Sequence, residues 1–92
     1  MANAYGLKTW KLDTAGTISS DRIRVSKMRW IPNAAGDDLL VSNSAGEVIW
    51  EITNALAGGV AGAEEVDFGD GHDIDGFVLT TLGGGVLYVW IK

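Results

Sequence analysis

The one histidine of the chain, His72, lies next to Asp73 in a stretch rich in glycine and aspartate. Nucleophilic catalysis needs a nucleophile, a base and an acid that orients the base. The candidate nucleophiles are Ser20, Ser42 and Ser44. Nothing in their spacing brings them to the histidine, whose surroundings are typical of a solvated turn. We therefore expect no catalytic residues and no enzymatic activity.

Six carboxylates fall within residues 64–75, and oxygen-rich turns of this kind are what hard cations prefer. They are Glu64, Glu65, Asp67, Asp70, Asp73 and Asp75. If Gly76 is aligned as the glycine of an EF-hand loop, Asp73 and Asp75 take ligand positions. Gly71 and Leu82 then stand where a first ligand and a bidentate glutamate are required, which excludes an EF-hand. We expect no metal and no cofactor, although the sequence leaves open whether the last three aspartates hold a cation.

Four of the seven positive charges gather within eight residues, at Arg22, Arg24, Lys27 and Arg29. Arg22 and Arg24 share one face of a strand, whereas the other two cations have the opposite phase unless a β-bulge realigns them. A basic strand of this kind can prevent the edge of the sheet from pairing with another chain. Alternatively, it contacts an acidic partner or the acidic segment of a neighbouring copy. If all four align, the molecule is bipolar, with one basic strand and one acidic turn.

The apolar residues of this stretch change phase at the same place. Ile23 and Val25 point one way, and Met28 and Trp30 have the opposite phase. A slip of one residue inside a strand is what a β-bulge produces. The sequence therefore predicts a bulge near residues 26–27.

The four tryptophans stand at positions 10, 30, 50 and 90, but their neighbours do not match, so the spacing indicates no duplication. Trp10 and Trp30 alternate with basic residues, and we expect them to serve as aromatic anchors at a partner contact. Trp50 and Trp90 lie within apolar strands and are expected in the core. A net charge of -5 and a pI near 4.5 argue against nucleic-acid binding, which needs a basic footprint.

A chain of 92 residues allows one domain, spanning residues 1–92. Thirteen glycines, one proline and the lack of any long helical periodicity predict an all-β fold. We expect a small antiparallel β-sandwich or barrel of six to seven short strands. The absence of cysteine excludes disulfides and thiolate chemistry.

The predicted strands are separated by glycine-rich turns. They cover residues 7–12, 22–31, 38–43, 47–53, 64–68, 76–82 and 86–92, with residues 17–20 as a loop or short edge strand. Two hairpins are expected, one closed at Gly46 by a left-handed turn residue and one closed by the three glycines at 83–85. Residues 69–73 are expected to form a turn, residues 1–4 a flexible start, and residues 54–63 a flexible Gly/Ala loop.

Neither end of the sequence shows a membrane signal. The longest apolar run, Val86 to Ile91, is much shorter than the roughly 20 residues that span a bilayer. The first six residues lack the basic and apolar regions of a signal peptide. We therefore expect no membrane association and synthesis in a cytoplasm.

Residues 22–92 show a recognisable order of strands and turns: the stretch Ile23 to Trp30, the Ala-Gly-Asp turn at 35–37, residues 39–41, the Gly46 to Glu51 strand, residues 74–76 and the ending Gly85 to Lys92. This order resembles that of small virion proteins of tailed bacteriophages. Many such proteins are short, cysteine-free and β-rich, and some decorate capsids or join head to tail. The resemblance carries no catalytic signature that transfers to individual positions.

The resemblance implies a structural protein of a phage particle, assembled in the cytoplasm of the host bacterium and located in the virion. The expected function is capsid decoration, in which the protein binds the major capsid protein or another virion protein and stabilises the shell. A homo-oligomer, for example a trimer, is expected. The residues expected at the contact are Arg22, Arg24, Lys27, Arg29, Trp10 and Trp30. The alternative is a tail-associated or carbohydrate-binding module that uses exposed tryptophans.

Overall fold

A computed structural model describes residues 3–5, 8–32, 36–53 and 64–92 and confirms an all-β domain, with no helix in these ranges. The seven strands are β1 (Ala4–Tyr5), β2 (Thr9–Leu12), β3 (Gly16–Ile31), β4 (Asp38–Ser42), β5 (Val48–Thr53), β6 (Glu64–Leu82) and β7 (Val86–Ile91). They form one antiparallel sheet in the order β1-β2-β7-β3-β6-β4-β5. The predicted flexible loop at residues 54–63 lies outside the described residues.

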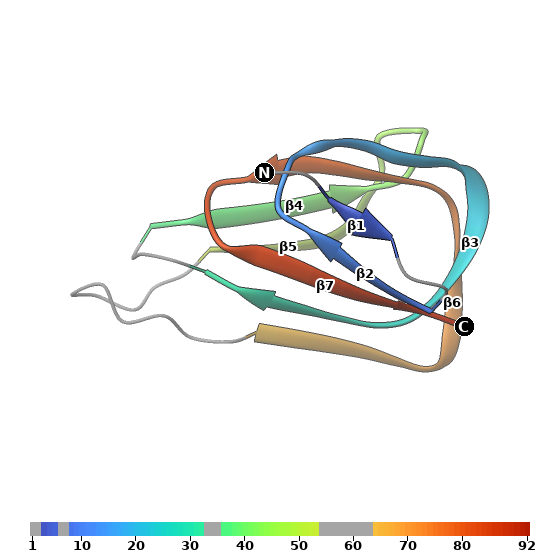
Figure 1. The fold of residues 1–92 in the computed structure, drawn as a ribbon. Helices are drawn as coiled ribbons and strands as arrows, with labels where there is room; N and C mark the ends of the chain where they lie inside the picture. Colours follow the sequence, from blue (N-terminus) through green and yellow to red (C-terminus); the bar gives the residue numbers. More distant parts are fainter. Residues whose placement is uncertain (1–2, 6–7, 33–35, 54–63) are drawn as a thin grey trace.

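The two longest strands, β3 and β6, pair along their length and bend together, so that the sheet folds over on itself into two layers (Figure 1). The first layer contains β1, β2, β7, the end of β3 and the beginning of β6. The second contains β4, β5, the beginning of β3 and the end of β6. The architecture is a β-sandwich whose layers are continuous through the bend.

A β-bulge sets the bend of β3. Val25 pairs with Ile91 and Lys27 with Trp90, so Ser26 is an extra residue against β7, as the phase change predicts. The hydroxyl of Ser26 donates a hydrogen bond to the carbonyl of Trp90 at 3.1 Å, which ties the bulge to the neighbouring strand. The predicted bulge near residues 26–27 is confirmed.

The expected turn at residues 69–73 is wrong, because β6 runs continuously through it. Opposite the bulge, Val25 pairs with His72 and Lys27 pairs with Asp67. Residues 68–71 of β6 lie between these two positions and have no partner in the register with β3. Gly69 and Gly71 have φ of 65° and 113° there, values that glycine adopts without the steric cost of a Cβ. The composition that suggested a chain reversal therefore marks a bend within one strand.

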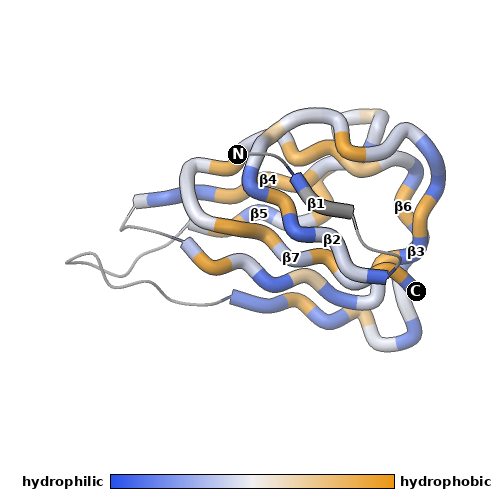
Figure 2. The backbone as a smooth tube through the Cα atoms, viewed as in Figure 1, coloured by the Kyte–Doolittle hydropathy of each residue, from blue (hydrophilic) through white to orange (hydrophobic). Residues whose placement is uncertain are grey.

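The core lies between the two layers. The first layer contributes Leu12, Val25, Met28, Trp30, Leu87 and Val89, and the second contributes Leu39, Val41, Ile74, Phe77 and Leu79, all fully buried or nearly so. Figure 2 shows hydrophobic and hydrophilic residues alternating along the strands, as expected for a sheet with one buried and one solvated face. Burial of these side chains is the main favourable term that holds the layers together.

The hairpin of β4 and β5 is confirmed. Gly46 has a φ of 84° and donates its amide to the carbonyl of Asn43 at 3.1 Å. The side-chain oxygen of Asn43 accepts hydrogen bonds from the amides of Ala45 and Glu47, at 3.0 and 2.9 Å. These contacts close the turn with groups that lie next to each other in the sequence.

The second expected hairpin is wrong, because β6 and β7 do not pair. In sheet order β3 separates them, and β7 inserts between β2 and β3. The glycines at 83–85 instead carry the chain from one layer to the other, where Gly85 passes directly against the backbone of Ile31 and Pro32. A side chain at Gly85 would occupy the space of those backbone atoms.

Residues 3 and 4, which belong to the expected flexible start at residues 1–4, lie against β2 and the residues that follow it. Ala4 pairs with Lys11 in the ladder of β1 and β2. The side-chain oxygen of Asn3 accepts hydrogen bonds from the amides of Asp13 and Thr14, at 2.7 and 2.9 Å. Backbone pairing and this side-chain contact hold the two residues against the sheet.

Candidate functional site

All four cations of β3 lie on the outer face of the sheet, because the bulge at Ser26 restores their common phase. Each one stands directly opposite a carboxylate of β6. The register pairs Arg22 with Asp75, Arg24 with Asp73, Lys27 with Asp67 and Arg29 with Glu65. Opposite charges at directly paired positions stabilise an antiparallel ladder and disfavour other registers.

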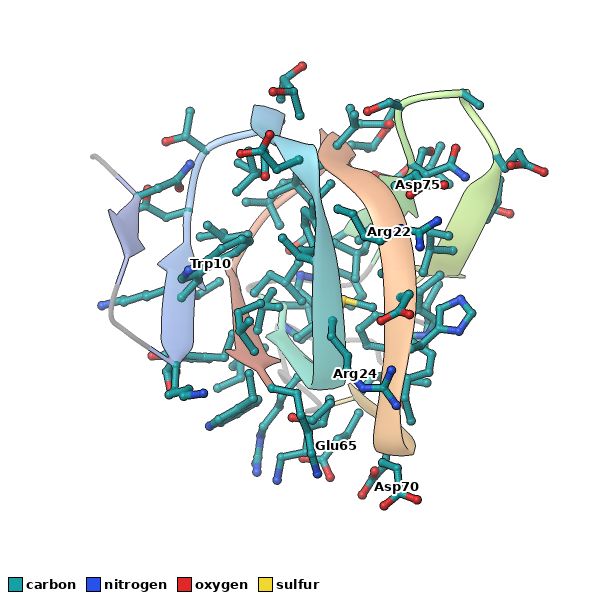
Figure 3. All side chains as sticks on the ribbon, turned by 90° about the vertical axis from the view of Figure 1, so that its right-hand side faces the viewer. Trp10, Arg22, Arg24, Glu65, Asp70 and Asp75 are labelled. Atoms are coloured by element: carbon teal, nitrogen blue, oxygen red, sulfur yellow. The ribbon has the colours of Figure 1, made fainter. Side chains whose placement is uncertain are left out.

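Two of these four pairs form close ion pairs across the bend. The Arg22 Nε lies 2.6 Å from Asp75 Oδ1, and its Nη2 donates to Asp75 Oδ2 at 3.3 Å. Arg24 Nη1 lies 3.1 Å from Asp73 Oδ1, and its Nε donates to the carbonyl of Asp70. Figure 3 shows Arg22 directed at Asp75 and Arg24 above Asp70 at the bend. The arginines therefore hold the bent part of β6 against β3.

This arrangement corrects the expected bipolar molecule. The acidic segment and the basic strand are neighbours in one sheet, and their charges face each other. The side chain of Arg22 is 66% exposed and that of Arg24 is 46% exposed, but their guanidinium groups are occupied within the chain. Exposed ion pairs contribute little stability each, so their main effect is on register.

The pKa of the Asp75 carboxyl lies below its ordinary value because Arg22 donates a hydrogen bond to the carboxylate and attracts its charge. A lowered pKa in the folded state stabilises the fold above the unfolded-state pKa, and this contribution is lost as the pH falls through the folded-state value. We expect Arg22→Thr to raise the pKa of Asp75 toward 3.8 and to flatten the dependence of stability on pH below about pH 4.

The measurement is a carbon-13 NMR titration of the Asp75 carboxyl, together with urea unfolding across the acid range. Arg24→Thr is the matched control, because Arg24 pairs with Asp73 and should leave the Asp75 titration in place. A titration of Asp75 at its ordinary pKa in the unmodified protein would contradict the prediction.

The tryptophans lie differently from the expectation. Trp30 is fully buried, and its indole nitrogen donates to the carbonyl of Gly84 at 3.0 Å, so its assignment as a contact residue is wrong. Trp10 is half-buried on the same inner face, with its ring edge-on to Phe77 at 6.0 Å between centroids. Trp50 packs against the core as expected, although it is only half-buried.

Trp90, expected in the core, lies on the outer face of the first layer. Register aligns it with Thr9 and Lys27 in one row, and aligns Tyr88 with Lys11 and Arg29 in the next. Directly paired residues point to the same side of a sheet. We call the set Lys11, Lys27, Arg29, Tyr88 and Trp90 the aromatic–basic face.

The aromatic–basic face lies on the adjacent strands β2, β7 and β3 of the first layer. The rings of Tyr88 and Trp90 lie 6.3 Å apart and are tilted by 34°, and the Lys27 ammonium lies 4.7 Å from the centroid of Trp90. Within the described residues Lys11 and Arg29 form no ion pair. Rings flanked by cations can bind an anionic surface and stack on flat apolar groups.

The alternation of residues along β7 already indicated that two of its side chains lie on the outer face. Leu87 and Val89 alternate with Tyr88 and Trp90, so one pair had to point away from the core. The apolar character of both faces of β7 concealed which pair this was. For Trp30 the signal was clearer, since it shares its phase with Met28 and opposes Arg29.

Other candidate sites gain no support. No pocket opens on the described part of the chain, and no three metal-ligating side chains gather among those residues. Asp73 and Asp75 are engaged by arginines, and His72 stacks on Phe68 with centroids 5.4 Å apart. A search of the described residues for helices that could cross a membrane finds none.

Comparison of the chain with protein-family models, with curated proteins and with solved structures gives no significant match to any of them.

Proposed function

We propose that this protein is a non-enzymatic structural subunit of a phage particle, a capsid decoration protein that binds and stabilises the shell. The observation that carries the binding role is the aromatic–basic face. It presents two rings and three cations on the middle strands of a layer, where β-pairing on both sides fixes their positions. Aromatic and arginine side chains dominate the energy of protein interfaces, and a prearranged surface has less conformational entropy to lose on binding.

The strand order of residues 22–92 supports the phage assignment through its resemblance to small virion proteins. A subunit that binds only the assembled shell stabilises that state by mass action. The cations of the aromatic–basic face call for an acidic surface on the partner. Arg22 and Arg24 serve the fold in this proposal, and Lys27 and Arg29 remain contact residues.

The test is co-sedimentation of the purified, untagged protein with intact heads of the phage that encodes it. We expect the unmodified protein to pellet with the heads and Lys11→Thr/Arg29→Thr to bind about tenfold more weakly, because two exposed cations are lost from the contact. Threonine suits a strand, so the fold should be retained. Lys8→Thr, which removes an exposed cation outside the face, is the control and should bind normally. Failure of the unmodified protein to pellet would overturn the shell-binding role.

The second candidate is a carbohydrate-binding or cell-surface module, and the Tyr88–Trp90 pair favours it. Two outward rings 6.3 Å apart could stack on sugar rings. In this alternative Tyr88 and Trp90 provide the stacking surface, in place of the exposed tryptophans expected from the sequence. Binding on a glycan array that is lost in Trp90→Thr and kept in Trp10→Phe would establish this function in place of capsid decoration.

A further inference from the structure

Charge is divided very unevenly along this chain. Residues 30–91 contain no lysine or arginine and hold ten of the twelve carboxylates. Four of these ten stand opposite the cations of β3, and within the described residues two of them, Asp73 and Asp75, form ion pairs there. Of the others, Asp37, Asp38, Glu47 and Glu51 fall in or next to β4 and β5, in a part of the fold without any cation.

The outer side of the hairpin of β4 and β5, in the second layer, is therefore acidic. Leu40 pairs with Glu51 on one side and Thr81 on the other, and Asp38 pairs with Thr53. These residues point away from the core because their neighbours Leu39 and Val41 are fully buried. Both carboxylates are exposed, and neither forms an ion pair within the described residues. We call Asp38 and Glu51 with Leu40 between them the acidic face.

The two large hydrophobic side chains that are exposed in the described ranges fall one on each of these sides. Ile31 is 39% exposed and follows Arg29 on the outer side of the first layer, paired with Val86. Val48 is 58% exposed at the beginning of β5, where a bulge at Ile49 separates it from Trp50 and leaves it on the outer side, paired with Ser42. Each side thus offers an apolar contact beside its charges.

We propose that the aromatic–basic face of one copy docks on the acidic face of a second copy, so that neighbouring subunits on the shell hold one another; this rests on the proposed structural function and names a neighbouring subunit as the partner of that face. Lys11, Lys27 and Arg29 outnumber the two carboxylates, Asp67 and Glu65, that stand opposite two of them, so the aromatic–basic face keeps a net positive charge that complements the acidic face on the other layer. A contact between different faces is heterologous, so each copy in a chain of contacts keeps one face for the next. Such subunits close into a ring, of which a trimer is the smallest, or continue as a filament.

Two variants that each block one face test the proposal. Lys11→Thr/Arg29→Thr removes charge from the aromatic–basic face, and Asp38→Asn/Glu51→Thr removes it from the acidic face. By sedimentation velocity we expect the unmodified protein to self-associate, less strongly as salt is added, and each variant to do so about tenfold more weakly. Near-ultraviolet circular dichroism of the tryptophans verifies that both variants are folded.

Mixing the two variants distinguishes this contact from a symmetric one. Each variant keeps the face that the other has lost, so an equimolar mixture should form one-to-one dimers that grow no further. In a symmetric contact of like faces the mixture would form no such dimer, and one variant alone would associate like the unmodified protein, which would overturn the proposal. Lys8→Thr is again the control and should associate normally.

The outcome is separable from that of the shell-binding test, because self-association is measured without heads. A protein that stays monomeric up to about 1 mM but pellets with heads overturns the self-docking and leaves the proposed function standing. A protein that associates head to tail but ignores heads supports the self-docking and removes the shell-binding role.

Discussion

Gly85→Ala is expected to destabilise the protein by about 4 kcal/mol, enough to lower the melting temperature by roughly 20 °C in a domain of this size. Gly85 has a φ of 81°, which costs an L-residue about 1–2 kcal/mol. An added Cβ would also overlap the carbonyl oxygen of Ile31 and lie 2.7 Å from the Cα of Pro32. Both are backbone atoms, so the crossover between layers would have to move.

Gly69→Ala separates the cost of backbone strain at a positive φ from the cost of the steric overlap of an added Cβ. Gly69 has a φ of 65°, but no atom lies within 4 Å of the Cβ position. Only the backbone strain remains there, and we expect a loss of about 1 kcal/mol. Urea unfolding of both variants measures the difference, and equal losses would show that the close approach at Gly85 is not what makes it necessary.

Trp30→Ala is expected to destabilise the fold by about 3–5 kcal/mol, the range for removing a large aromatic residue from a core. The side chain is fully buried between the layers, and its indole N–H bonds to Gly84. Trp30→Phe keeps much of the apolar contact but leaves that carbonyl without its donor, for an expected loss of about 1–3 kcal/mol.

Trp90→Ala is the matched control, because it removes the same side chain from the outer face. It loses the contacts with Tyr88 and Lys27 but opens no cavity in the core. We expect a loss of about 1 kcal/mol, measured by urea unfolding. A cost equal to that of Trp30→Ala would mean that the two faces of the layer are assigned the wrong way round.

The charge ladder between β3 and β6 shows what spacing alone could and could not reveal. Two clusters of opposite charge were visible in the sequence, and the phase change located the bulge that aligns the basic cluster. Their juxtaposition was not visible, because Arg22 and Asp75 are 53 residues apart and meet only when β3 and β6 pair. A bend within β6, rather than a turn, brings the acidic residues alongside.

The sequence alone determined the all-β class, the Ser26 bulge and the β4–β5 hairpin. These features depend on the alternation of apolar and polar residues and on turn residues, which act over only a few positions. Only the tertiary structure decided that β7 inserts between β2 and β3 and that Trp30 is buried in the core while Trp90 lies half-buried on the outer face. Backbone hydrogen bonds are alike between any two strands, so burial of the whole core selects the partners. Period-two alternation shows which residues share a face, but where both faces are apolar, as on β7, only packing of the second layer determines which one is inside.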